Sequence, residues 1–262
     1  MTNPINPASV PPEYIVPHCF RQFIQLIALQ STRKGGISNA PYYSLNLGSN
    51  TEDSADNVHR NTLRLCSAIG IDPEKMVSSV QVHGTEILAA DKPGRHKGFD
   101  ALITDKKDLF LCIYTADCYP ILIFDPRHQA AGAVHAGWKG SAGHIVKKTV
   151  AAMQKNFNSI PAECFAWIGT GISATAYEVG LDVAREFPHE NWRRSVLPQE
   201  NDKYFLDLRL ANYHQLLASG IPPSNIEQSQ FCSLGDSSMF FSYRRDNGKT
   251  GRMVSLIGIR SL

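Results

Sequence analysis

The stretch LFLCIYTADCYPILIFDPRHQAAGAVHA, residues 109–136, decides the fold class of this protein. It contains three short apolar runs, LFLCIYT at 109–115, PILIFD at 120–125 and AAGAVHA at 130–136, and turn-forming residues bound each of them. Apolar runs of this length between turn residues are typical of buried strands. We therefore predict three consecutive buried strands. Outside this stretch, CFAWIG at 164–169 and VSLIGI at 254–259 have the same character.

Helical patterns flank these strands. Residues 54–69 form an amphipathic segment with a capping candidate at Asp53 or Ser54 and a terminating glycine at position 70. In residues 141–157, apolar side chains recur at helical spacing from Val146 to Phe157, which predicts one helix capped by Ser141. Residues 208–219 complete the set.

This mixture predicts an α/β fold, in which a single compact layered domain contains mixed β-sheets flanked by helices. No repeat, low-complexity tract or linker interrupts residues 20–262, so one domain is the simpler interpretation. Residues 1–19 are expected to form an extended, Pro-rich N-terminal arm, because five prolines among the first 17 residues prevent a regular helix.

Composition excludes several classes of function. The formal net charge is +2 and the basic residues are not clustered, so nucleic acid is not an expected partner. No basic region precedes an apolar leader and no apolar run is long enough to span a membrane, which favours a cytoplasmic protein without a membrane partner. The six cysteines form no CxxC pair, so neither a disulfide framework nor a zinc ribbon is expected.

The segment AVHAGWKGSAG at 133–143 is the first candidate for a ligand site. Its buried strand ends at His135, and a loop with Gly137 and Gly140 leads into a helix whose free N–H groups favour an anion such as phosphate. Lys139 would add a full positive charge. The alternative is a tight strand-to-helix turn beside a histidine of the core.

Two other segments indicate a metal. SVQVHGTEI at 79–87 places His83 beside a turn, and YTADCYPILIF at 114–124 places Cys118 between two strands. Two imidazoles and a thiolate suit Zn²⁺, and three protein ligands leave the fourth tetrahedral position open for water, as in catalytic sites. His83, Cys118 and His135 are therefore the predicted metal ligands and catalytic residues. A fourth ligand such as Asp117 would close the site and favour a non-catalytic metal-binding or partner-binding protein, but neighbouring strand residues usually point in opposite directions.

The chain resembles the bacterial laccase-like polyphenol oxidase family, whose members are also described as purine nucleoside phosphorylases or peptidoglycan editing factors. The matching stretches cover nearly the whole body: STRKGGIS at 31–38, YSLNLG at 43–48, QVHG at 81–84, TADCYPILIFDP at 115–126, HAGWKG at 135–140, YEVG at 177–180 and FFSYRRDNGKTGRM at 240–253.

The resemblance implies a metal site at His83, Cys118 and His135 and a fold shared with bacterial toxin-like cysteine hydrolases. It also implies phosphorolysis of adenosine, inosine and methylthioadenosine, with deamination of adenosine at the same site. One branch of the family is linked instead to editing of peptidoglycan precursors.

Phosphorolysis requires a phosphate site beside a ribose site. The predicted substrate contacts are Arg60, Lys139 and the 137–141 backbone for phosphate, Asn46 for ribose, and Ser44 and Gln81 as weaker candidates. Each has an ordinary alternative, since arginines on helices are usually solvated and Asn46 can simply shape a turn.

One segment departs from the family pattern. The sequence IGTGISATAYEVG at 168–180 has Thr170 and Ser173 where the family commonly has two prolines. We expect a change in the shape of this loop, and with it in substrate preference, while the three ligand segments stay intact.

Two other enzyme activities compete with nucleoside phosphorolysis. A multicopper oxidase needs many paired histidines, but the nine histidines here are scattered and none are spaced as HxH, so copper is expected only as an adventitious occupant. A metal-free cysteine hydrolase would use Cys118 as nucleophile with His135 or His83 as its base. The two alternatives exclude each other at one sulfur atom, because a thiolate bound to zinc is a poor nucleophile. The sequence predicts no oligomeric state.

Overall fold

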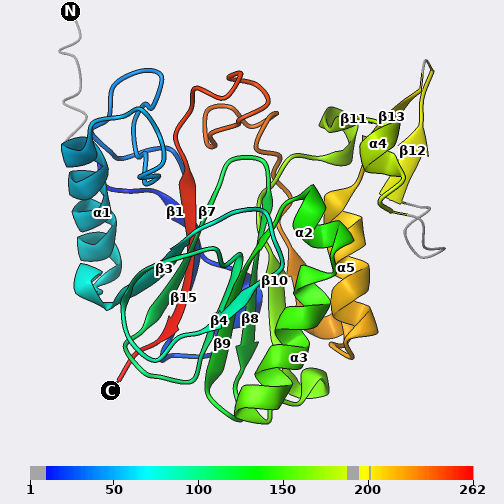
Figure 1. Ribbon diagram of the computed structural model, residues 1–262. Helices are drawn as coiled ribbons and strands as arrows, with labels where there is room; N and C mark the ends of the chain where they lie inside the picture. Colours follow the sequence, from blue (N-terminus) through cyan, green and yellow to red (C-terminus); the bar gives the residue numbers. More distant parts are fainter. Residues whose placement is uncertain (1–9, 188–194, 201, 262) are drawn as a thin grey trace, which may run out of the picture.

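Two six-stranded sheets form the body of the molecule (Figure 1). The first has the order β1-β2-β15-β7-β3-β5, the second has the order β14-β10-β8-β9-β6-β4, and a small third sheet has the order β11-β13-β12. In the first sheet β3 runs parallel to β5 and β7, while β15 is antiparallel to β2 and β7. The prediction of an α/β fold with mixed sheets is therefore confirmed.

The computed structural model describes residues 10–187, 195–200 and 202–261. Its strands are β1 Tyr14–Ile15, β2 Leu26–Ser31, β3 Met76–Val80, β4 Ile87–Ala89, β5 Gly94–Lys97, β6 Ala101–Thr104, β7 Phe110–Thr115, β8 Tyr119–Asp125, β9 Ala130–Ala136, β10 Phe165–Ile168, β11 Glu178–Gly180, β12 Val196–Pro198, β13 Lys203–Leu206, β14 Ile226–Gln228 and β15 Met253–Ile259. Its α-helices are α1 Ala55–Ile69, α2 Trp138–Ala142, α3 Ile145–Phe157, α4 Leu181–Ala184 and α5 Leu208–Ala218.

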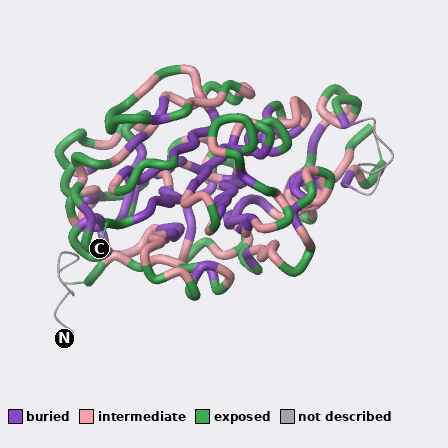
Figure 2. Tube along the Cα trace, turned by 90° about the horizontal axis from the view of Figure 1, so that it is seen from below, coloured by how far each residue is buried: buried purple, intermediate pink, exposed green. Residues whose placement is uncertain are grey.

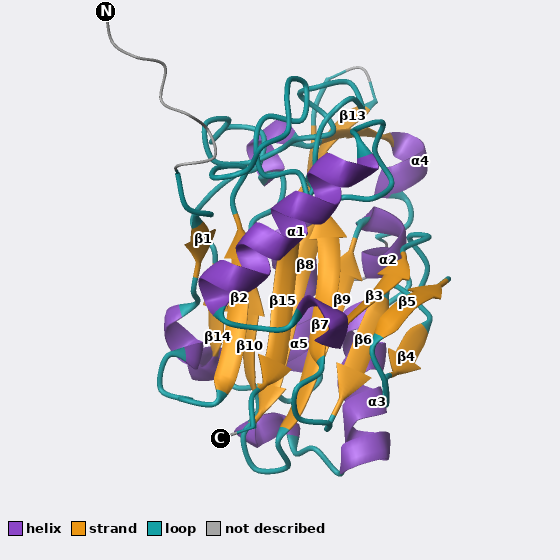
Figure 3. Ribbon diagram, turned by 90° about the vertical axis from the view of Figure 1, so that its left-hand side faces the viewer, coloured by secondary structure: helices purple, strands orange, loops and turns teal. Residues whose placement is uncertain are grey.

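The two large sheets pack face to face, with helices on their outer faces (Figures 1 and 3). Between the sheets lies an apolar cluster to which Leu111 and Ile257 contribute from one sheet and Leu122 and Trp167 from the other. Helix α1 covers the first sheet, and α3 and α5 cover the second. Buried residues accordingly run through the middle of the molecule (Figure 2). The result is a four-layer sandwich that leaves the loops at the strand ends free for function.

The three strands predicted from residues 109–136 are present as β7, β8 and β9. They do not form a continuous meander, because β7 pairs with β15 and β3 in the first sheet whereas β8 and β9 pair in the second. The short connection at 116–118 therefore crosses from one sheet to the other. This crossing places Cys118 at the end of the sandwich, between the two layers.

The prediction of one helix over 141–157 is wrong. The structure has α2 at Trp138–Ala142 and a separate α3 at Ile145–Phe157, with His144 between them at a φ of 62°. Ser141 does not cap a helix, because its hydroxyl is paired with the side chain of Asn212 on α5. The other segments agree with expectation: α1 ends at Gly70 in the left-handed conformation, and α5, β10 and β15 lie where predicted.

The described part of the Pro-rich segment, from residue 10 on, contributes strand β1, which pairs with β2 at the edge of the first sheet. Among the described residues, no helix has both the length and the apolar character needed to cross a membrane.

Candidate functional site

The side chains of His83, Cys118 and His135 meet at one end of the sandwich. His83 lies in the loop between β3 and β4, Cys118 lies at the crossing between β7 and β8, and His135 is near the end of β9. One ligand atom from each lies within 4.8 Å of the others. The fold thus brings together the three residues that the sequence singled out, although 35 and 17 positions separate them along the chain.

This group has the donor set and the spacing of a metal site. Around tetrahedral Zn²⁺, bonds to histidine nitrogen and cysteine sulfur put the ligand atoms about 3.3 to 3.6 Å apart, within the observed limit. His135 is buried and Cys118 half-buried, while His83 is exposed to solvent. A metal held here would therefore be reached from one side, the side of His83.

Asp100, directly before β6, orients both histidines. Its Oδ1 accepts a hydrogen bond from Nδ1 of His135 at 2.7 Å and from the backbone N–H of His83 at 3.0 Å. Its Oδ2 accepts from the backbone N–H groups of Val82 and Gly84 at 3.1 and 2.7 Å. Such a bond to Nδ1 leaves Nε2 of His135 facing the cluster, and three converging amides form a nest for the carboxylate.

The backbone of His83 has a φ of 60°, in the left-handed region that non-glycine residues rarely occupy. The nest around Asp100 compensates this unfavourable conformation. Sequence reasoning missed Asp100, although a carboxylate next to the apolar run ALIT was a usable signal for a buried, paired acid.

The ionisable groups of the cluster shift one another's pKa values. Burial would raise the pKa of the Cys118 thiol, but the charge of His135 and hydrogen bonds with both histidines outweigh it and lower this pKa to about 6. Burial would lower the pKa of His135, but the charge of Cys118 and the hydrogen bond to Asp100 raise it to about 9. The pocket thus stabilises the thiolate, which is the form that binds metals and attacks electrophiles.

Gly137 makes room for the cluster. A Cβ atom at this position would lie 3.0 Å from Sγ of Cys118 and 3.0 Å from Cδ2 of His83. The sequence pattern predicts an anion site at this glycine, at the start of the following helix. That helix, α2, has only five residues, and residues 137–141 do not line the adjacent cavity. The glycine instead allows close packing behind the metal ligands.

A cavity of about 540 Å³ opens above the cluster. This volume lies within the range of small-molecule sites, about 300 to 1,000 Å³. Its lining comes from both sheets and from residues 229–252, the segment between β14 and β15 that we call the C-terminal loop. The lining residues are Gly48, Ser49, Asn50, Ser79, Gln81, His83, Arg95, Tyr114, Thr115, Ala116, Asp117, Cys118, His135, Ile172, Tyr177, Tyr243, Arg244 and Arg252.

Two arginine–tyrosine pairs form one wall of this cavity. The guanidinium of Arg244 lies 5.2 Å from the ring centre of Tyr177 and donates to the carbonyl of Glu178. The guanidinium of Arg252 lies 5.6 Å from the ring centre of Tyr243 and donates through one nitrogen to two backbone carbonyls. A guanidinium has five N–H donors, so each arginine keeps donors for an anion. Sequence reasoning missed both residues, although the matching stretch 240–253 contains them.

Of the predicted substrate contacts, only Gln81 lines the cavity, and its side chain bonds both backbone polar groups of Tyr114. Asn46 lies behind the wall, where its Oδ1 accepts from the backbone N–H of Arg252 and its Nδ2 donates to Asp53. Ser44 is buried between Gly36 and Arg33. Asn46 and Ser44 thus support the wall instead of forming it.

Arg60 and Lys139 lie away from the cavity. Arg60 is on the exposed face of α1, where it pairs with Asp56 one turn earlier. Lys139 is exposed on α2, with Nζ 5.5 Å from the ring centre of Trp138. Neither lines the cavity, so the structure does not support their predicted contact with phosphate. Both long cationic side chains are exposed to solvent.

Thr170 and Ser173, which stand where the family commonly has prolines, each donate a hydrogen bond from the backbone N–H. Thr170 donates to Oε1 of the buried Gln30 at 2.8 Å, and Ser173 donates to Sγ of Cys232 at 3.3 Å. A proline at either position could not donate. This loop, which carries Ile172 and Tyr177 to the cavity, is thus anchored by bonds that proline would not permit.

In the part of the chain that the structure describes, His83, Cys118 and His135 form one group able to hold a metal, and no second such group accompanies it. One of the nine histidines of the chain, His189, lies outside the described residues.

Comparison with known proteins places the chain in a family. Residues 27–260 match the family described as multi-copper polyphenol oxidoreductase laccase. A protein of Deinococcus radiodurans named purine nucleoside phosphorylase is 39% identical over 259 residues, which cover 99% of this chain and 95% of that protein. A protein of the same name from Bacteroides thetaiotaomicron is 37% identical over 87% of this chain and 90% of that protein.

Solved structures agree with this assignment. The crystal structure of the Bacillus licheniformis hypothetical protein YfiH superposes with a TM-score of 0.91 at 32% identity and covers 95% of this chain and 97% of its own. YlmD from Geobacillus stearothermophilus gives a TM-score of 0.84 at 34% identity, with 92% and 94% covered. The chain therefore belongs to the multi-copper polyphenol oxidoreductase laccase family, whose curated relatives include proteins named purine nucleoside phosphorylase.

Proposed function

We propose that this protein is a cytoplasmic, zinc-dependent purine nucleoside phosphorylase that cleaves inosine, adenosine and methylthioadenosine with phosphate and deaminates adenosine at the same site. The observation that carries the proposal is the cavity, which combines a His-Cys-His group at its base with a wall of arginines and tyrosines. The names of the relatives support the reaction class.

Deamination of adenosine consumes one water molecule and releases ammonia, whereas the atoms of phosphorolysis balance without a reactant besides phosphate. Phosphorolysis breaks the bond between ribose C1′ and a purine nitrogen and forms a bond from C1′ to a phosphate oxygen. The electron pair of the broken bond stays on the purine nitrogen, which takes up a proton. The proton that hydrogen phosphate carries balances this uptake.

The residues of the cavity divide this work. Arg244 and Arg252 bind phosphate through charge-assisted hydrogen bonds, which are about twice as strong as neutral ones. Tyr114, Tyr177 and Tyr243 offer aromatic faces to the purine and apolar surface to the ribose. His83, Cys118 and His135 would hold Zn²⁺, which suits two imidazoles and a thiolate; copper fits the same donors as an adventitious occupant. When bound, Zn²⁺ supplies positive charge and Lewis acidity next to the substrate.

The test is chromatographic product analysis with metal-quantified protein and inosine or adenosine, in the presence and absence of phosphate. We expect free base only when phosphate is added, together with inosine from adenosine in either condition. Base release that does not depend on phosphate would show hydrolysis and overturn phosphorolysis. Absence of any product from either nucleoside would overturn the proposal as a whole.

A second candidate function is amide hydrolysis, for example of a peptidoglycan precursor, with Cys118 as the nucleophile. The observation that favours it is a chain of hydrogen bonds: the imidazole of His135 contacts the Cys118 sulfur, and the Asp100 carboxylate bonds Nδ1 of the same imidazole. The same arrangement of thiolate, imidazole and carboxylate serves cysteine hydrolases. Zinc binding and nucleophilic attack require the same sulfur atom. Amide hydrolysis by the metal-free protein, inhibited by added zinc, would therefore favour this alternative.

A further inference from the structure

Asp117, the residue before Cys118, has a carboxylate that the proposed reaction does not use. The residue lines the cavity, yet it is only 9% exposed. Its φ of 87° lies in the left-handed region, which Asp and Asn tolerate better than most side chains. It therefore sets the course of the chain into Cys118 at the crossing between the two sheets.

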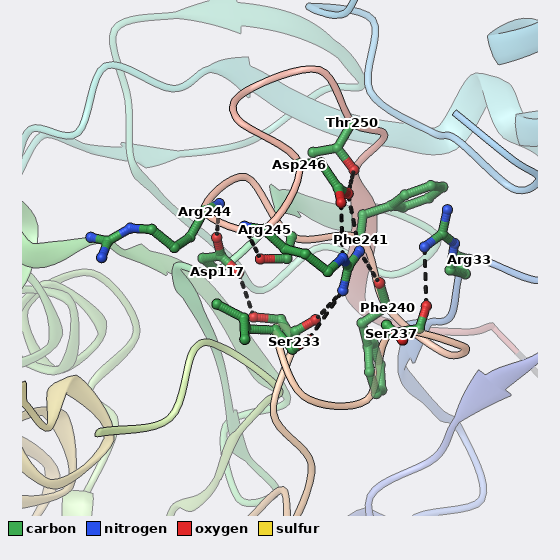
Figure 4. A network of polar contacts seen from close by, with 12 residues as sticks. Arg33, Asp117, Ser233, Ser237, Phe240, Phe241, Arg244, Arg245, Asp246 and Thr250 are labelled. Atoms are coloured by element: carbon green, nitrogen blue, oxygen red, sulfur yellow. Dashed lines mark hydrogen bonds and ion pairs between the residues drawn. The ribbon is translucent and has the colours of Figure 1, made fainter. Parts of the chain in front are cut away.

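The carboxylate of Asp117 bonds the C-terminal loop twice (Figure 4). Oδ1 accepts from the hydroxyl of Ser233 at 2.6 Å, and Oδ2 accepts from the backbone N–H of Arg244 at 2.7 Å. Its backbone carbonyl also accepts from Ile172 at 2.8 Å. One residue thus connects the metal-binding turn with two other segments that line the cavity, and more than fifty positions separate it from each of them.

The C-terminal loop also has internal bonds that do not involve Asp117. Arg245 forms an ion pair with Asp246 and donates to the backbone carbonyls of Ser233, Leu234 and Phe240 (Figure 4). Thr250 donates to the same Asp246. These bonds hold the loop together from inside. The two bonds to Asp117 instead fix where the loop stands relative to Cys118.

We propose that Asp117 is a positioning residue, which holds the Cys118 sulfur and the Arg244 guanidinium in one geometry by hydrogen bonding and not by its charge. The inference rests on the proposed function, in which one of these groups holds zinc and the other binds phosphate. Orientation of this kind is worth a large factor in rate, since a displacement of about 1 Å can cost about 100-fold.

The two hydrogen bonds of the Asp117 side chain predict different effects for substitution by Asn and by Ala. Asn can keep both contacts, because its oxygen can accept from the N–H of Arg244 while its amide donates to the hydroxyl of Ser233, which can act as acceptor. Asn also tolerates the left-handed backbone. Ala loses both contacts. Asp117→Asn should therefore retain what Asp117→Ala loses.

The experiment compares D117A, D117N and S233A with T250V, a control that breaks a bond inside the same loop without touching Asp117. The readouts are kcat and KM for inosine and phosphate, zinc affinity, and the rate at which iodoacetamide alkylates Cys118 after zinc is removed by a chelator. Thermal unfolding verifies that each variant is folded.

We expect D117A to raise the phosphate KM, to lower kcat/KM by about 10-fold to 100-fold and to change the alkylation rate. S233A should show a smaller change in the same direction. D117N and T250V should stay within about threefold of the unmodified protein, the latter because it leaves both bonds of Asp117 and the ion pair between Arg245 and Asp246 intact. Equal loss in D117A and D117N would overturn the proposal, since it would assign the effect to charge. An effect of T250V as large as that of D117A would also overturn it.

Alkylation and zinc affinity need no turnover, so they test the positioning role even if nucleosides prove not to be substrates. An unchanged alkylation rate and zinc affinity in folded D117A would refute the positioning role by itself. Failure of the unmodified protein to cleave nucleosides would refute only the proposed function.

Discussion

The end of the cavity formed by the candidate metal ligands, here called the metal end, and the arginine wall are built in different ways. At the metal end, His135 lies within a fully buried strand and Asp100 is itself buried, with each carboxylate oxygen accepting two hydrogen bonds. On the wall, Arg244 is exposed and Arg252 half-buried, and both stand on the loop before β15. Strand β9 and the hydrogen bonds of Asp100 fix the two histidines closely, whereas the position of the arginine wall depends on contacts that anchor its loop, such as those of Asp117.

This difference separates two kinds of effect. Changes at the metal end should remove the chemistry for every substrate, because the metal ligands are common to all of them. Changes on the wall should alter KM for the anion and leave metal binding intact. The predictions below test this separation, beginning with the largest effect.

Replacement of His135 by Ala should abolish zinc binding and phosphorolysis together. The substitution removes one of three ligands and leaves the Asp100 carboxylate buried without its imidazole partner. Metal analysis after gel filtration and turnover of inosine measure the two losses. Turnover retained in a demonstrably metal-free variant would break the comparison, since the metal end would then be dispensable.

The pH dependence of thiol alkylation should locate the Cys118 thiolate in the metal-free protein. Because its pKa is lowered from 9.0 to about 6, the reactive thiolate should form as the pH rises through about 6. At pH 7 most of this thiol is then ionised, whereas an ordinary cysteine is almost fully protonated. The rate of iodoacetamide labelling between pH 5 and pH 9 measures the midpoint, with Cys118→Ala as the control that assigns the label. A midpoint near the ordinary value would show that the histidines do not stabilise the thiolate.

Substitution of Gly137 by Ala should weaken zinc binding by about 10-fold to 100-fold, which is typical of changes next to metal ligands. The new methyl group would lie 3.0 Å from both Cys118 Sγ and His83 Cδ2, closer than carbon normally approaches either atom. Competition with a chelator measures the zinc affinity. Gly235→Ala is a matched control, because its methyl group would meet only Cys232, at 3.7 Å. Equal affinities in the two variants would contradict the role assigned to Gly137.

Substitution of Arg252 by Gln should raise the phosphate KM by about tenfold, the value of one charge-assisted hydrogen bond, with zinc content unchanged. Steady-state kinetics at varied phosphate concentration measures it. Arg60→Ala sharpens the test, because Arg60 faces solvent on α1 and should leave this KM unaltered. The reverse pattern would return the phosphate site to α1 and remove it from the C-terminal loop.

The sequence predicts the candidate metal ligands but not the arginines of the cavity wall. His83, Cys118 and His135 were identifiable because each places a metal-binding side chain in otherwise apolar sequence beside a turn. Arg60 and Lys139 are predicted phosphate contacts because they are cations in or near expected helices. A helix presents such residues to solvent unless another element packs over them. Arg244 and Arg252 gave no local signal of this kind, since arginines in a polar loop resemble any solvated segment.

The helix predicted over 141–157 failed for a related reason. Its apolar periodicity was correct for α3, but Gly143 and Gly140 let α2 pack closely on the loop that holds His83, and the chain turns between the two helices. Helical periodicity reports burial of one face and contains no information about such a contact.

By itself, the sequence determined the main buried strands, the mixed α/β class and the donor set of the candidate metal site, because these depend on short-range periodicity and on the chemistry of single side chains. Only the tertiary structure decided that β7 and β8 belong to different sheets, that Asp100 orients both histidines, and that Asp117 joins the Cys118 turn to the C-terminal loop. These contacts connect residues that are distant along the chain. They form because strand pairing and sheet packing satisfy backbone hydrogen bonds and bury apolar surface over the whole molecule, which no local pattern records.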